Sequence, residues 1–160
     1  MTTHAQRVRI GELLYLLVEN AQLVRYPSRD VRTRRASEIK TEKQLLASLD
    51  AGSFEFDCSQ TAEIVCVVAG LNWPASMRDG YTGTMLAHLP HYANHANADL
   101  GALAVFGPGT GQHVCQARKA LGQNPTLYSH GADRSSYYVS LAVERTFHRP
   151  PVTFLSIANL

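Results

Sequence analysis

The sequence predicts an α+β fold, with helices in the first part of the chain and an antiparallel sheet in the second. Three helices are expected before residue 70, over residues 9–21, 40–49 and 58–69. Four later segments have the composition of short strands separated by Gly, Pro and Asn turns, at residues 103–106, 113–117, 126–130 and 152–157. Residues 138–147 fit either a helix or a strand. Helices that precede the strands in this way favour an α+β arrangement.

The chain has the size and composition of one domain over residues 1–160. Of its 160 residues, 45% are apolar, which is enough to bury a core. A formal charge of +2 does not indicate nucleic-acid binding, and the apolar stretches are too short for membrane insertion. The N-terminus lacks the apolar centre of a signal peptide, so synthesis in a cytoplasm is expected. With 3 cysteines, reduced thiols are favoured over a disulfide framework.

Residues 1–50 are predicted to form a helical N-terminal extension to a core of residues 54–160. In the first helix, apolar residues from Ile10 to Ala21 recur at helical spacing. An arginine-rich segment follows, with Asp30 as its one acid. Its arginines are Arg25, Arg29, Arg32, Arg34 and Arg35. The segment fits either a solvated loop or a contact with an anionic polymer.

A cysteine stands at the expected start of the third helix. Asp57 is a favourable N-cap, and Gln60 completes a capping-box pattern three positions later, so Cys58 should be the first helical residue. At that place the unpaired backbone N–H groups and the helix dipole stabilise a thiolate, and the same N–H groups can hold an oxyanion. Cys58 is therefore the candidate nucleophile.

Two histidines are placed to assist Cys58. His113 and His130 lie on strands that follow one another in the chain, and a hairpin between these strands would bring the two imidazoles together. We expect His113 to be the base that takes the proton of Cys58. We expect His130 to fix the tautomer of His113, the role that an Asp or Asn has in other triads.

These residues, in this order, resemble the NlpC/P60-type cysteine peptidases, a papain-like family. Residues 56–59 (Phe-Asp-Cys-Ser) look like the nucleophile motif of the family, and residues 101–107 resemble its first sheet strand. Residues 112–114 (Gln-His-Val) resemble its Gly-His-Val strand, and residues 129–131 (Ser-His-Gly) match the position of its third polar residue. The end of the chain is similar to that of peptidase domains in actinobacteriophage endolysins, so the resemblance covers residues 54–160.

The resemblance implies a peptidoglycan hydrolase that cleaves stem peptides, usually between D-glutamate and a diamino acid. The mechanism would use a Cys58 thiolate and a thioester intermediate, without a metal or another cofactor. It also implies a phage endolysin or a virion-associated lysin, made in the host cytoplasm and acting at the cell wall. We expect five side chains to form the substrate-binding site: Phe56, Asp57, Ser59, Trp73 and Gln112. Trp73 fits a core or loop anchor as well.

The chain departs from the family pattern at three places. Gln60 stands where glycine is usual, Ala102 stands where aspartate usually precedes the first strand, and Cys115 replaces a common glycine. These differences alter the floor of the expected pocket. The bond that is cleaved therefore stays open at this point.

Other assignments fit the sequence and define rival predictions. One is a wall-binding or structural virion module without turnover, and another is a thiol acyltransferase or a peptidase acting on proteins.

His88, His91 and His95 lie close together, but Pro90 interrupts the helix that would align them, which favours a surface loop over a metal site. Cys66 and Cys115 are assigned to packing.

Overall fold

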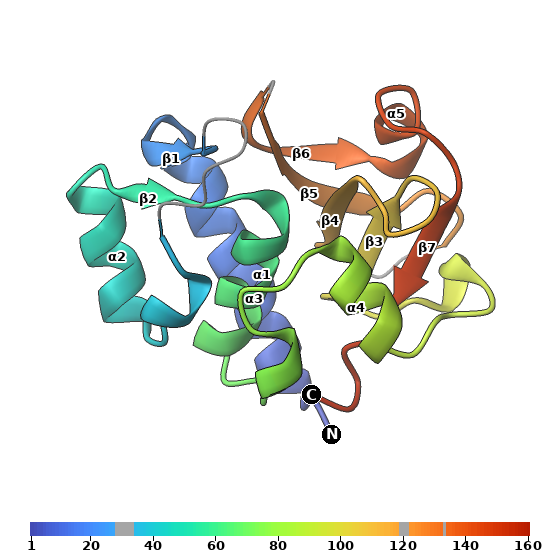
Figure 1. The fold of residues 1–160 in the computed structure, drawn as a ribbon, viewed down its shortest axis with the longest axis horizontal. Coiled ribbons are helices and arrows are strands. Elements are labelled where there is room, and N and C mark those ends of the chain that lie inside the picture. Colours follow the sequence, from blue (N-terminus) through green and yellow to red (C-terminus); the bar gives the residue numbers. More distant parts are fainter. Residues whose placement is uncertain (28–33, 119–121, 133) are drawn as a thin grey trace.

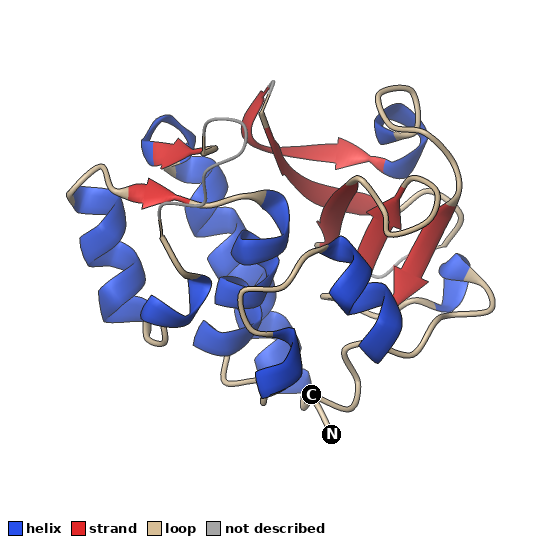
Figure 2. Ribbon diagram, viewed as in Figure 1, coloured by secondary structure: helices blue, strands red, loops and turns tan. Residues whose placement is uncertain are grey.

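The structure is a computed structural model that describes residues 1–27, 34–118, 122–132 and 134–160. The three longest helices gather on one side of the molecule, and the sheet forms the other side together with two shorter helices (Figures 1 and 2). The sheet has five strands in the order β6-β5-β4-β3-β7, and every neighbouring pair is antiparallel. The α+β prediction is therefore confirmed. Among the described residues, no helix has the length and apolar character needed to span a bilayer.

The helices begin where the sequence supplies capping side chains. The α-helices are α1 (His4–Glu19), α2 (Glu42–Asp50), α3 (Cys58–Val68), α4 (Thr82–His88) and α5 (Leu141–Glu144). Thr3, Thr41 and Asp57 each cap one of the first three through a capping box, in which the side chain accepts a backbone N–H of the first turn. All three predicted helices are present. The connection over residues 71–97 contains α4 and short 3₁₀ turns at Ala75–Met77 and His95–Asn97.

The four predicted strands are present, and the structure adds three more. The large sheet contains β3 (Leu103–Phe106), β4 (His113–Ala117), β5 (Thr126–Gly131), β6 (Arg134–Ser140) and β7 (Val152–Leu155). A separate parallel pair joins β1 (Val24–Arg25) to β2 (Phe54–Glu55). The ambiguous segment 138–147 holds both kinds of structure, because β6 ends at Ser140 and α5 begins at Leu141.

Side chains alternate across the large sheet and give it two apolar faces. Leu103, Val105 and Val114 join the core that α1, α2 and α3 fill, whereas Phe106 and Cys115 belong to a second apolar cluster on the opposite face. Successive residues of one strand therefore lie in different environments. This division decides which polar side chains of β4 and β5 can meet.

The N-terminal helix belongs to the same core as the sheet. Ile10 and Leu14 of α1 are buried in one apolar cluster with residues of α3, β3 and β7. At Gly101, before β3, φ is +86°, and an added Cβ would lie 2.8 Å from Ile157 Cδ1 and 2.9 Å from Ile10 Cδ1. Glycine at position 101 thus lets α1 and the C-terminal segment close over the start of the sheet.

The packing of α1 can be tested by a core truncation. Leu14→Ala removes a fully buried side chain and should lower the free energy of unfolding by about 2–5 kcal/mol. Leu46→Ala on α2 is the matched control, because Leu46 is 39% exposed and its loss should cost less than about 1 kcal/mol. Urea unfolding followed by circular dichroism measures both. Equal small losses would contradict the placement of α1 in the core.

Candidate active site

Cys58 is the first residue of α3, as predicted, and its cap is complete. Asp57 Oδ1 accepts from the Gln60 backbone N–H at 2.9 Å and from Ser59 Oγ at 2.7 Å, and Asp57 N donates to Gln60 Oε1 at 3.3 Å. Gln60 Nε2 also donates to the carbonyl oxygen of Arg34 at 2.8 Å. Gln60, which departs from the pattern of the family that the sequence resembles, is thus part of the structure that positions the candidate nucleophile.

His113 stands at the start of β4, close enough to Cys58 for their charges to interact. Burial would raise the pKa of the Cys58 thiol, but the positive charge of the nearby His113 imidazolium outweighs burial and lowers that pKa. Burial would likewise lower the pKa of His113, whereas charge interactions and hydrogen bonding with Cys115 and Cys58 raise it well above its ordinary value. Both directions favour a thiolate–imidazolium pair.

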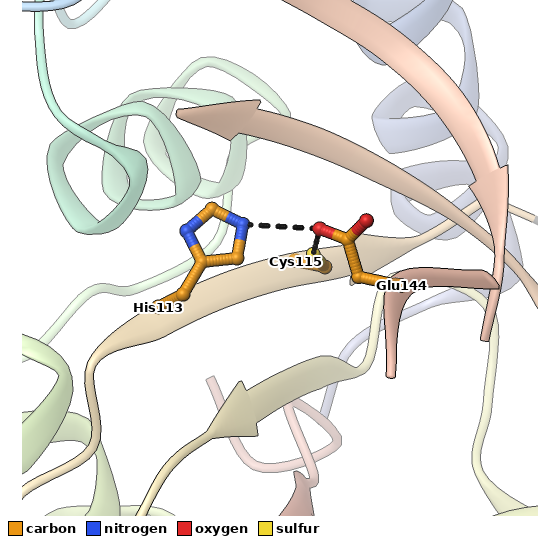
Figure 3. A group of neighbouring side chains, drawn as sticks. All are labelled: His113, Cys115 and Glu144. Atoms are coloured by element: carbon orange, nitrogen blue, oxygen red, sulfur yellow. Dashed lines mark hydrogen bonds and ion pairs between the residues drawn. The ribbon is translucent and has the colours of Figure 1, made fainter. Parts of the chain in front are cut away.

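The far nitrogen of His113 is connected to a buried carboxylate through a serine. His113 Nε2 lies 3.0 Å from Ser129 Oγ and 3.4 Å from Glu144 Oε1 (Figure 3), and Ser129 Oγ donates to the same carboxylate oxygen at 2.6 Å. Because the serine proton is directed to Glu144, Ser129 accepts from His113, so Nε2 carries the proton. That tautomer leaves Nδ1 free to take a proton from Cys58.

Glu144 is the polar centre of this face of the sheet. It is fully buried at the end of α5. Oε1 also lies 3.3 Å from Cys115 Sγ and 3.3 Å from His148 Nε2, and Oε2 accepts from Tyr137 OH at 3.2 Å. Burial would raise the pKa of the carboxyl group, but the hydrogen bonds, led by those from His113 and His148, hold it well below its usual range. The group is therefore a carboxylate.

The predicted hydrogen bond between His130 and His113 is not formed, and the register of the sheet explains why. Gln116 pairs with Tyr128 and Ala117 with Leu127, so continuing the register sets Ser129 on the face of His113 and His130 on the other. His130 Nε2 lies 2.9 Å from the carbonyl oxygen of Phe56, and Nδ1 has no hydrogen-bond partner among the described residues. Burial lowers the pKa of His130 to about 4, so the imidazole is neutral.

A cavity of about 340 Å³ opens beside His113. Described residues that line it include Gln112, Arg134 and His148. The His148 ring stacks on that of His113 with centroids 4.2 Å apart. Tyr26 also lines the cavity, and its hydroxyl lies 3.9 Å from Cys58 Sγ. The cavity thus extends from Tyr26, whose hydroxyl lies beside the Cys58 thiol, to the stacked imidazoles of His113 and His148.

Only part of the expected substrate-binding set is placed at this cavity. Gln112 lines it, as expected. Phe56, Ser59 and Trp73 are buried instead, which corrects the expectation that they contact a substrate. Phe56 packs edge-on against Phe54, Ser59 donates to the cap, and Trp73 belongs to the main apolar core. Asp57 is committed to capping α3. The sequence motif around the nucleophile is therefore structural for the most part.

The remaining thiols differ from each other. Cys66 is fully buried in α3, and burial raises the pKa of its thiol to about 12, so the packing assignment holds. Cys115 is buried as well, but its sulfur lies in the polar cluster around Glu144. Packing alone therefore does not describe Cys115.

The three histidines of residues 88–95 each have a different hydrogen-bond partner. His88, His91 and His95 contact three different backbone carbonyl oxygens, those of Thr84, Leu86 and Gln123. This arrangement agrees with a surface segment.

The arginine-rich segment is described in part. Arg34 donates to the carbonyl oxygen of Ser53 and to Ser48 Oγ, and its guanidinium lies 5.4 Å from the centre of the Phe56 ring. This arginine therefore supports the approach to the nucleophile. Arg29 and Arg32 lie outside the described residues.

Sequence reasoning did not find Tyr26, Ser129, Glu144 or His148. Ser129 stands next to His130, the residue predicted to orient His113. Which of the two side chains faces His113 depends on the register of β5 against β4, which only the folded sheet defines. Glu144 and His148 are four residues apart, in or just after the segment whose secondary structure was ambiguous. Tyr26 precedes the undescribed residues 28–33 and carried no motif.

Comparison of the chain with family models, with curated proteins and with solved structures found no match in any of the three.

The lowered pKa of Cys58 predicts unusual thiol reactivity. At pH 7, iodoacetamide should alkylate Cys58 selectively, and the rate should fall as the pH drops through the pKa of the thiol. In His113→Ala the positive charge is lost and burial raises that pKa, so alkylation at pH 7 should be at least about tenfold slower. Peptide mass spectrometry identifies the modified cysteine, and Cys58→Ala is the control. Equal rates with and without His113 would contradict the pairing.

The contact between His113 and the Glu144 carboxylate predicts how a substitution at Glu144 changes the pKa of His113. Glu144→Gln removes the negative charge near Nε2, so the pKa of His113 should fall, and the neutral imidazole should appear at lower pH. NMR of the imidazole Cε1–H signals measures the midpoint. His130→Gln is the matched control, because His130 lies on the opposite face. A larger change in the control than in Glu144→Gln would show that His130 sets the state of His113.

Proposed function

We propose that this protein is a cysteine hydrolase with a papain-like arrangement, in which Cys58 is the nucleophile and His113 the base. The observation that carries the proposal is the placement of His113 between a carboxylate and a thiol. The imidazole is held by Ser129 and Glu144, and its charge lowers the pKa of a thiol at a helix N-terminus. A nucleophile, a base and an orienting carboxylate in this order are the parts that acyl transfer requires.

The proposed reaction follows from these placements. The Cys58 thiolate attacks a carbonyl carbon, and the backbone N–H of Cys58, together with a neighbouring donor, stabilises the oxyanion. Protonated His113 then gives its Nδ1 proton to the leaving amine, and a thioester forms on Cys58. His113 next takes a proton from water, which hydrolyses the thioester and restores the thiolate. Glu144 keeps the imidazolium favourable through both steps.

We infer that the substrate is the stem peptide of peptidoglycan. This inference rests on the resemblance of residues 54–160 to NlpC/P60-type peptidases. One feature of the cavity agrees with it, because Arg134 lines the wall and lies 4.2 Å from the centre of the Phe147 ring. A cation held there suits an acidic peptide, and stem peptides carry free carboxylates. The corresponding biological role is that of a phage endolysin or virion-associated lysin acting at the cell wall.

Fragment release from peptidoglycan tests the proposed function. Purified actinobacterial peptidoglycan is incubated with the parent protein and with Cys58→Ala, both shown to be folded, and mass spectrometry identifies the soluble products. New stem-peptide ends from the parent alone are expected, and their masses identify the bond. No release by either protein, with wall binding intact in both, would favour a binding module. Cleavage of protein substrates in place of muropeptides would favour the protein peptidase.

A further inference from the structure

Three buried side chains beside the proposed base have the composition of a metal site. Ligand atoms of His113, Cys115 and Glu144 all lie within 4.8 Å of one another, and they come from β4 and α5 (Figure 3). The proposed reaction uses His113 and Glu144 but gives no role to the thiol of Cys115. We propose that these three residues bind Zn²⁺, and that the bound ion inhibits the enzyme.

The spacing of the ligand atoms suits zinc. A tetrahedral Zn²⁺ holds nitrogen and oxygen at about 2.0–2.1 Å and sulfur at about 2.3 Å, which separates neighbouring ligand atoms by about 3.3–3.6 Å. Glu144 Oε1 lies 3.4 Å from His113 Nε2 and 3.3 Å from Cys115 Sγ. Both pairs that include Glu144 Oε1 thus have tetrahedral spacing, and the third pair, between His113 and Cys115, lies within 4.8 Å and would close onto the ion.

The charges also balance. A thiolate and a carboxylate together neutralise Zn²⁺, and the imidazole binds as a neutral ligand. This balance matters because Glu144 and Cys115 are buried, and an unpaired charge there would be costly. Binding releases the proton of the Cys115 thiol and the proton on His113 Nε2, and it replaces the contact between His113 and Ser129.

The cavity gives the ion a path. His113 lines the cavity of about 340 Å³, and so does His148, whose Nε2 lies 3.3 Å from the same carboxylate oxygen. The fourth coordination position would face this cavity and take a water molecule.

Inhibition follows from the tautomer of His113. With Nε2 bound to zinc, the imidazole is neutral and keeps its one proton on Nδ1, so it can neither form the imidazolium that pairs with the Cys58 thiolate nor give that proton to a leaving amine without becoming an imidazolate. Zinc would thus remove the base without touching the nucleophile. Inhibition rests on the proposed function, whereas binding of the ion does not.

Cobalt is the probe for binding, because Co²⁺ occupies zinc sites and its thiolate complexes absorb light. Chelator-treated protein titrated with Co²⁺ should develop a thiolate-to-cobalt band that one equivalent of Zn²⁺ removes. Cys58→Ala should keep the band, whereas Cys115→Ala should lose it and bind Zn²⁺ at least about 100-fold more weakly. X-ray absorption of the zinc-loaded parent, which needs no variant to fold, should show one sulfur ligand with nitrogen and oxygen ligands.

Alkylation of Cys58 tests inhibition without a substrate. Zn²⁺ should slow the alkylation of the parent at least about tenfold at pH 7, and it should have little effect on Cys115→Ala, each compared with its own metal-free rate. Failure to release stem peptides would leave these results unchanged, so the two proposals fail separately. A cobalt band that depends on Cys58, the absence of any band, or faster peptide release with Zn²⁺ would overturn the inhibitory site.

Discussion

The buried carboxylate of Glu144 is the interaction on which the rest of the site depends. A carboxylate without solvent is tolerated only where donors surround it. Here Ser129, Tyr137, Cys115 and the two stacked imidazoles meet that need from β4, β5, β6 and the segment after α5. Removing a donor would leave buried charge poorly compensated, so strands that are distant in sequence are held in one geometry by a single anion.

The strand order of the sheet places the Glu144 carboxylate beside His113, the proposed base. β4 lies between β3 and β5 at the middle of the sheet, and α3 packs on the opposite side from Glu144. His113, at the first position of β4, can therefore contact the thiol at the start of α3 with one nitrogen and the serine–carboxylate pair with the other.

Local sequence signals predicted the parts of the fold that depend on neighbours in the chain. The cap of α3 is such a case, since Asp57 and Gln60 specify it within four residues, and the positions of the strands are another. The partner of His113 is different, because alternation along β5 offers either Ser129 or His130. A register shift of one residue decides between them, and that shift is set by packing across the whole sheet. The role of Glu144 likewise depends on a feature that local sequence patterns leave open, the turn from β6 into α5.

Tyr26 links the N-terminal segment to the chemistry of the core. Its ring lies 5.3 Å from that of His130, its hydroxyl approaches Cys58, and the preceding strand β1 pairs with β2 directly before the nucleophile. For protein engineering, the consequence is that residues 54–160 are not a portable module. A fusion protein that carried only that part would lack Tyr26, which lines the cavity and lies beside the thiol. The N-terminal segment therefore has to be kept in any such fusion.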